Sequence, residues 1–329
     1  MSYPYTAASN LFNLLHRFVD PANPPPEVDY NLYRLLHEDL AYASDNEILE
    51  HFRTTGKAEG RVASAAAHRN GFLQLLKGDL PTLEIGPFIK PALRGGNVSY
   101  FDVLDREGLI RRSQEIGFVG TEPVDINFVE PTGNLSIVPS ESFDRVFSSH
   151  CIEHQPDLVC HLQHVARILR PFGRYYLIIP DKRYCFDHFL DVSELPAVLE
   201  AHDERRTAHS VRSVYEHYAL TTHSDPIGHW SNWHDDPNIN DRAQRAENAI
   251  MTFDQAKGKY IDVHAWQFTP DSFRVLLFEL TRLGLIELQI ERTYDTVWSQ
   301  YEFTAILTKI ENSNAFRLGY SDPSETSDD

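Results

Sequence analysis

The chain has little cysteine and no long apolar run. Only three of its 329 residues are cysteine, Cys151, Cys160 and Cys185, and their spacing matches no metal-binding motif. This count excludes a disulfide-stapled scaffold and favours a reducing compartment, so we predict a cytoplasmic location. No run of about 18 apolar residues is present, which excludes a transmembrane helix, and the N-terminus shows no secretory signal pattern.

Basic residues are also scarce. Lysine and arginine total 30 against 48 acidic residues, which gives a formal net charge of −18. A surface this acidic repels phosphate backbones, and the densest basic runs, Arg111-Arg112 and Arg205-Arg206, are too short to form a local basic patch. We therefore expect no nucleic-acid partner. Residues 313–329 are predicted to form a disordered acidic tail.

The most informative segment present is Thr82–Phe88 (T-L-E-I-G-P-F), followed by V-S-Y-F-D at 98–102. An apolar strand that enters a glycine turn, with an acid closing the next strand, is typical of α/β sheets that bind nucleosides at their carboxyl ends. Pro87 and Phe88 stand where G-x-G-x-x-G would carry further glycines, so a cofactor with a pyrophosphate is disfavoured. The pattern favours S-adenosylmethionine, although the glycine alone is more typical of a buried strand that ends in a turn.

Three further segments extend the pattern: S-F-D-R-V-F at 142–147, I-E-H at 152–154 and R-I-L-R-P-F-G at 167–173. With L-E-I-G-P at 83–87, and in this order, they resemble class I S-adenosylmethionine-dependent methyltransferases over roughly residues 80–310. The resemblance implies an α/β fold, a doubly wound and mostly parallel seven-stranded sheet of Rossmann-like type. It also implies S-adenosylmethionine as cofactor and methyl transfer as the reaction.

Two other segments resemble methyltransferases found among bacterial glycan-assembly enzymes. They are I-P-D-K-R-Y-C-F-D-H-F at 179–189 and V-H-A-W-Q-F-T-P at 263–270. The run H-F-x-x-x-G-K-A-E-G-R at 51–61 resembles short modules that accompany bacterial glycosyltransferases. These resemblances imply a sugar or glycan substrate and possible glycosyltransferase partners, and they leave a homo-oligomer open.

The chain divides into three predicted parts, of which the acidic tail at 313–329 is the last. Residues 1–65 form a helical module with a proline-rich link at 21–26, and residues 66–312 form the methyltransferase domain. Within that domain, residues 183–262 are an insertion that caps the substrate site. We expect a helix through residues 162–169 that ends at Pro171-Phe172-Gly173, another over 273–283, and two closing strands over 285–290 and 301–307.

The family resemblance also implies which residues bind the cofactor. Glu84, Gly86 and Pro87 are expected beside the methionine and ribose portions, and Asp102 on the ribose hydroxyls, with Asp105 as the second choice. Asn134 and Leu135 fall where the family contacts adenine, although Glu130–Leu135 departs from the usual D-x-x-x-L-P pattern. Ser149 and His150 are expected at the methionine end.

Methyl transfer to oxygen is an in-line displacement, and positioning can supply about 7–11 kcal/mol of the barrier. A sugar hydroxyl also needs a general base, which contributes about 10²–10⁴-fold, or a metal ion that acidifies it. Histidine suits the base because its pKa lies near neutral pH. His150 is the first candidate, and Asp181, His188 and His264 follow. Asp181 could instead cap the next turn.

Aromatic and polar side chains in the insertion are candidates for substrate contacts. They are His154, Arg183, Tyr184, His229, Trp230, Trp233 and His234. The tryptophans suit sugar rings and equally suit the core of a helical cap, while His154 could simply orient its loop. A divalent metal on some combination of Asp181, His188, His234 and Asp235 stays open. So do methylation of a small metabolite or amine, and a non-catalytic scaffold.

Overall fold

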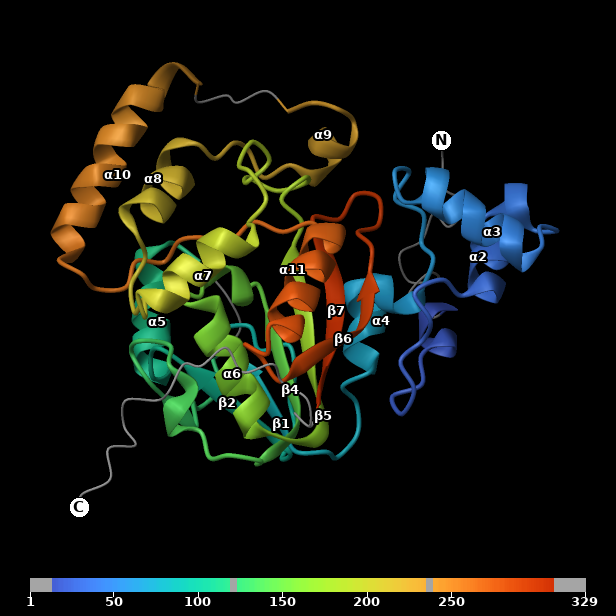
Figure 1. Cartoon of the computed structure of the whole chain (residues 1–329), viewed down its shortest axis with the longest axis horizontal. Coiled ribbons are helices and arrows are strands. Elements are labelled where there is room, and N and C mark those ends of the chain that lie inside the picture. Colours follow the sequence, from blue (N-terminus) through green and yellow to red (C-terminus); the bar gives the residue numbers. More distant parts are fainter. Residues whose placement is uncertain (1–13, 119–122, 235–238, 311–329) are drawn as a thin grey trace.

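The computed structural model describes residues 14–118, 123–234 and 239–310 (Figure 1). Its centre is a seven-stranded sheet in the order β3-β2-β1-β4-β5-β7-β6. Strands β1 to β5 run parallel, and β7 lies antiparallel to both β5 and β6. The predicted mostly parallel, seven-stranded sheet is confirmed. The strands are β1 Thr82–Ile85, β2 Val98–Asp102, β3 Phe128–Val129, β4 Phe143–Ser149, β5 Leu169–Pro180, β6 Leu288–Tyr294 and β7 Glu302–Lys309.

Both faces of the central strands are buried, as period-two alternation along β5 shows. Tyr175, Leu177 and Ile179 enter one apolar cluster, while Tyr176 and Ile178 enter the cluster on the opposite face. A parallel strand covered on both sides reads as an almost continuous apolar run because neither face meets water. The long apolar segment Tyr175–Ile179 therefore forms the middle of the sheet.

Helices cover the two faces. Helices α6 and α11 contribute to the first cluster, and α4 with the N-terminal module covers the second. The helices are α2 Tyr30–Leu36, α3 Asp45–His51, α4 Arg69–Gln74, α5 Arg106–Glu115, α6 Leu158–Ile168, α7 Leu195–Asp203, α8 Val211–Ala219, α9 Pro226–Trp230, α10 Arg242–Ala256 and α11 Pro270–Arg282. Helices α7 to α10 belong to the insertion and lie mostly above the carboxyl ends of the strands (Figure 1).

The start of β5 differs from the prediction. Helix α6 ends at Ile168, and the segment Arg170–Gly173 already belongs to β5. The pairing register between β4 and β5 shifts between Phe143 and Arg145, so this segment forms an irregularity at the strand's beginning. Arg170 holds it in place by an ion pair of 2.6 Å with Asp144. The proline therefore lies inside an irregular strand end and does not mark the end of the helix.

The connection from β1 to β2 contains no helix. Residues 86–97 form turns and extended backbone. The buried carboxylate of Glu84 organises them by accepting hydrogen bonds from the backbone N–H groups of Ala92 at 2.7 Å and Leu93 at 3.0 Å. A side chain of β1 thus replaces the backbone bonds that a crossover helix would make internally.

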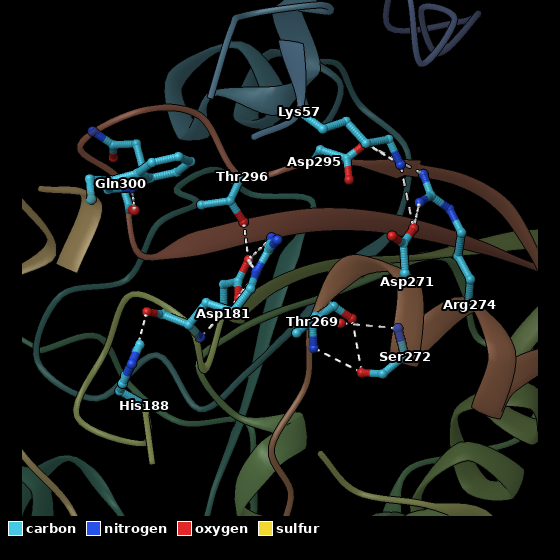
Figure 2. A network of polar contacts seen from close by, with 12 residues as sticks. Lys57, Asp181, His188, Thr269, Asp271, Ser272, Arg274, Asp295, Thr296 and Gln300 are labelled. Carbon is cyan, nitrogen blue, oxygen red and sulfur yellow. Dashed lines mark hydrogen bonds and ion pairs between the residues drawn. The ribbon is translucent and has the colours of Figure 1, made fainter. Parts of the chain in front are cut away.

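The N-terminal module packs against the last part of the sheet. Lys57 lies 3.4 Å from Asp271 of α11 and 3.3 Å from Asp295 after β6 (Figure 2). The carbonyl of Gly60 accepts a hydrogen bond of 2.8 Å from the Trp298 N–H. Residues far apart in sequence therefore share one interface, and the motif at 51–61 contributes directly to it.

Gly60 is the tightest point of that interface. Its φ is +64°, and an added Cβ would lie 2.4 Å from the Trp298 backbone nitrogen. We expect Gly60→Ala to lower the free energy of unfolding by about 1–2 kcal/mol from the left-handed backbone, and by about 1–3 kcal/mol more from overpacking. Gly117 is a matched control because its φ is +69° with nothing within 4 Å of an added Cβ. Urea unfolding of both variants measures the difference, and equal losses would contradict the close contact.

Candidate active site

The loops that follow β1 and β4 meet beside the carboxyl end of β2. Gly86 follows β1 with a φ of +68°, and its added Cβ would lie 3.6 Å from the Cys151 sulfur after β4. Gly86 is itself exposed, and its N–H donates to the Phe101 carbonyl of β2 at 2.9 Å. The glycine turn therefore passes close to its neighbours and stays open to a ligand.

Asp102 lies at the carboxyl end of β2, as predicted. Its carboxylate accepts hydrogen bonds from the Val103 N–H at 2.7 Å and, at 3.4 Å each, from the N–H groups of Leu104 and Phe88. Burial raises the pKa of Asp102 to about 6. The negative charge of Asp262 also raises this pKa, whereas the three N–H groups lower it. The acid is therefore held between the first two loops, within electrostatic range of the end of the insertion.

Three of the other residues expected at the cofactor accept local hydrogen bonds, and two more are buried apolar residues. Both Glu84 oxygens are engaged by the Ala92 and Leu93 amides, and burial raises its pKa to about 7. Asp105 caps α5 through the Gly108 N–H, and Asn134 caps the turn at Leu135–Ile137. Leu135 is buried in the core, so adenine contact would fall to its neighbours. Pro87 is buried beside Gly86.

A network of hydrogen bonds between charged and polar side chains fixes the end of β4. Arg69 of α4 donates to both carboxylate oxygens of Glu302 in β7 and to the Ser149 hydroxyl at 2.9 Å. Glu302 also lies 2.8 Å from Nε2 of His150. Burial works to raise the pKa of Glu302, but His150 and Arg69 outweigh it and hold that pKa at about 2. His150 thus has a permanent anionic partner.

Three histidines surround one buried glutamate. Glu153 is fully buried, and neither of its carboxylate oxygens has a hydrogen-bond partner. Its Oε1 lies 3.6 Å from Nε2 of His154, 3.8 Å from Nε2 of His264 and 3.9 Å from Nδ1 of His150. His150 has a φ of +51° and is followed by a 3₁₀ turn, so it is not one α-helical turn from His154, although both rings face Glu153.

The outer nitrogens of these rings meet carboxylates. Nδ1 of His264 lies 2.6 Å from Asp187, and Nδ1 of His154 lies 3.1 Å from Asp262. Burial works to lower the pKa of His264, but Asp187 outweighs it, so this pKa lies above its ordinary value. His154 holds the pKa of Asp262 at about 2. Glu153, His154 and His264 offer three ligand atoms within 4.8 Å of one another, a set that could hold a divalent metal.

The backbone positions His264 over this group. Residues 259–267 return from the insertion as extended chain, and the N–H groups of Ala265 and Trp266 both donate to the Glu153 carbonyl, at 2.7 and 3.1 Å. Trp266 is buried beneath, with its indole N–H bonded to the Gln155 carbonyl at 2.6 Å. The segment identified at 263–270 therefore joins the loop after β4.

The other two predicted catalytic residues lie elsewhere. Asp181 is fully buried and accepts from the Thr296 hydroxyl at 2.6 Å and from the Arg183 side chain at 2.6–3.2 Å (Figure 2). Its carboxylate also accepts from the Arg183 N–H at 3.0 Å, so the alternative that it caps the next turn is supported. His188 belongs to a separate histidine group. The expected catalytic set therefore divides between two places.

The predicted substrate residues divide in the same way. His154 joins the Glu153 group, whereas His229 and His234 join His188. Tyr184 and Trp230 stack on each other, with centroids 3.8 Å apart and planes 7° apart, and the Trp230 indole N–H donates to the Gln300 carbonyl. Trp233 is 47% exposed and stacks on His223. Asp235, the remaining metal candidate, lies outside the described residues.

A cavity of about 880 Å³ opens beside α7 and α8. None of the predicted site residues lines it, but Trp266 and His209 do, and Nε2 of His209 donates a 2.9 Å hydrogen bond to the His154 carbonyl. Its charged lining residues are Asp191, Glu194, Glu200, Arg206, Arg212 and Glu216. Trp266, which lines this cavity and donates its backbone N–H to the Glu153 carbonyl, therefore lies between the cavity and the group around Glu153.

Sequence reasoning missed Glu153, Asp187, Asp262 and Glu302 as partners of the histidines. Glu153 was visible in the I-E-H motif, and Asp187 lies within the segment 179–189. Nothing local marks Asp262 or Glu302, because each meets its histidine only through tertiary contact.

A comparison of this chain with known protein families agrees with the strand order and with the acid at the end of β2. A family described as "Methyltransferase domain" matches residues 109–177, from α5 to β5. The fold is that of class I S-adenosylmethionine-dependent methyltransferases. S-adenosylmethionine is the cofactor that belongs to this methyltransferase fold.

Solved methyltransferases are among the structures to which the chain is similar. An S-adenosylmethionine-dependent methyltransferase from Aquifex aeolicus is 10% identical, with a TM-score of 0.34, covering 81% of this chain and 100% of that chain. One from Methanosarcina mazei is 16% identical, with a TM-score of 0.35 and coverage of 73% and 96%. These similarities concern the fold alone. The search of curated proteins gave no match. Among the described residues, no helix of this methyltransferase fold could cross a membrane.

Proposed function

We propose that this protein transfers a methyl group from S-adenosylmethionine to a hydroxyl of a glycan or sugar intermediate, with His264 as the general base. The observation that carries the proposal is the buried His264–Asp187 pair at 2.6 Å, which faces Glu153 at the carboxyl end of β4. A carboxylate on Nδ1 fixes the tautomer of an imidazole and leaves Nε2 free to accept a proton.

Bound S-adenosylmethionine supplies an electrophilic methyl on a sulfonium. Asp102 would accept hydrogen bonds from the ribose hydroxyls, and the open turn at Gly86 would let the backbone approach the nucleoside. His264 Nε2 would take the proton of the acceptor hydroxyl as its oxygen bonds to the methyl carbon and the carbon–sulfur bond breaks. The imidazolium formed would lie between Asp187 and Glu153, whose negative charges stabilise it.

Two observations support a polar, sugar-like acceptor. The cavity beside α8 is lined by charged side chains of both signs, which suit hydroxyl-rich ligands. The exposed indole of Trp233 offers a flat apolar face of the kind that packs on sugar rings. The sequence resemblance at 179–189 and 263–270 points the same way.

A second acceptor class is favoured by one observation. The carboxylate of Glu153 is fully buried and accepts no hydrogen bond, so it would suit a cationic amine, which needs negative charge more than a base. A metal on Glu153, His154 and His264 would be a third arrangement, in which the ion acidifies the hydroxyl.

Incubation with methyl-labelled S-adenosylmethionine and panels of nucleotide sugars, oligosaccharides and amines tests the proposal. We expect label in the sugar panel without added Mg²⁺ or Mn²⁺. Label only in the amines would replace the hydroxyl acceptor, and a requirement for added Mg²⁺ or Mn²⁺ in sugar labelling would replace the histidine base with a metal. Glycosyltransferase partners, a homo-oligomer and a cytoplasmic location stay predictions.

A further inference from the structure

A second histidine group lies apart from Glu153, between the loop after β5 and the insertion. His188 follows β5, His229 lies in α9, and His234 follows α9. Their rings are nearly parallel, and the centroid of His188 lies 4.0 Å from that of His234 and 4.8 Å from that of His229. One ligand atom from each lies within 4.8 Å of the other two.

Backbone carbonyls fix two of the three tautomers. Nδ1 of His188 lies 2.7 Å from the Arg183 carbonyl oxygen, and Nε2 of His229 lies 3.1 Å from the His223 carbonyl oxygen. A carbonyl only accepts, so each of these nitrogens carries a hydrogen, and the lone pairs reside on Nε2 of His188 and Nδ1 of His229. An outer N–H bonded to a carbonyl is how proteins orient metal-binding histidines.

Two ring nitrogens inside this group, one from His229 and one from His234, lie too close together to have no interaction. Nδ1 of His229 is 3.1 Å from Nδ1 of His234, and His229 is only 2% exposed. Two imidazole nitrogens at this distance need either one shared hydrogen or a cation between them. The third ring, that of His188, stacks on both, so its ring must turn about the Cβ–Cγ bond for its Nε2 lone pair to meet an ion shared with the other two.

We propose that His188, His229 and His234 bind a transition-metal ion of the zinc class. Three neutral imidazoles suit Zn²⁺, Co²⁺, Ni²⁺ or Cu²⁺, whereas Mg²⁺ and Ca²⁺ prefer oxygen ligands. Three protein ligands leave a position for water or another donor. The ion would connect the loop after β5 to α9, whose Trp230 stacks on Tyr184, and so would hold the insertion over the sheet.

The test uses full-length, tag-free protein freed of metal with a chelator. We expect one Zn²⁺ per chain by elemental analysis after gel filtration, a rise in melting temperature with Zn²⁺ but not with Mg²⁺, and visible absorption bands on Co²⁺ binding. His188→Gln and His234→Gln, both at half-buried positions, should each weaken zinc binding by more than about 100-fold, beyond the loss typical of outer partners.

Glu153→Gln is the matched control because it removes a ligand from the other candidate group. Zinc retained in Glu153→Gln and lost in the two histidine variants supports the proposal. Zinc lost only in Glu153→Gln would place the metal at the active site and overturn it. Absence of Co²⁺ bands in the unaltered protein would overturn it whether or not the variants fold. Because these readouts measure metal binding, failure of the proposed methyl transfer leaves them unaffected.

Discussion

Replacing His264 with glutamine should lower turnover by about 10²–10⁴-fold, the usual contribution of a general base. The affinity for S-adenosylmethionine should stay nearly constant, because no predicted cofactor contact involves this ring. Glutamine keeps a polar group beside Asp187, which is buried and would otherwise lose its partner. Single-turnover methylation and calorimetric binding of the cofactor measure the two quantities.

His202→Gln is the matched control, since His202 also pairs with a largely buried aspartate, Asp157 at 3.0 Å, outside this group. It should leave turnover unchanged. If His264→Gln keeps full activity and His150→Gln loses it, the general base is His150 and not His264. His150 is more exposed, at 27% of its side chain, and has Glu302 as its partner.

Replacing Asp102 with asparagine should weaken S-adenosylmethionine binding by about 10- to 100-fold, since a hydrogen bond to a charged group contributes about 1.5–3 kcal/mol. The unaltered protein should also show pH dependence. With the pKa of Asp102 raised to about 6, the carboxylate that accepts the ribose hydrogen bonds is lost as pH falls through that value. Affinity should therefore be flat above pH 7 and fall about tenfold per pH unit well below 6.

Asp102→Asn should abolish this slope because asparagine does not titrate. Isothermal calorimetry between pH 5 and pH 8 measures both proteins. If the slope persists in the variant, another acid controls binding, and Asp105→Asn is the next substitution to compare.

The sequence predicted the sheet well because its signals are local. Alternating burial along Tyr175–Ile179 and the glycine turn after β1 depend on neighbours in the chain. The end of α6 was predicted too late because Pro171 lies in an irregular strand end created by pairing with β4. The helix-free connection between β1 and β2 is organised by Glu84, whose amide partners lie eight and nine residues further on.

The candidate site was harder to predict, for a physical reason. Strand-like alternation cannot predict the direction of His264, because Val263, His264 and Trp266 are all buried in non-strand backbone. Two N–H bonds to the Glu153 carbonyl bring the ring to the site instead. Likewise, Asp181 and His188 follow one strand but face different neighbours, since Thr296 and Arg183 occupy the first and α9 approaches the second.

The last described strand, β7, inserts between β5 and β6 and carries Glu302. During synthesis on the ribosome, one edge of β5 therefore stays unpaired until residues 302–309 emerge. An unpaired strand edge makes a nascent sheet prone to aggregate. Glu302, whose carboxylate pairs with His150 and Arg69, belongs to that same strand. Closure of the sheet and completion of this charge network are consequently one event, and a chain cut short before β7 would have neither.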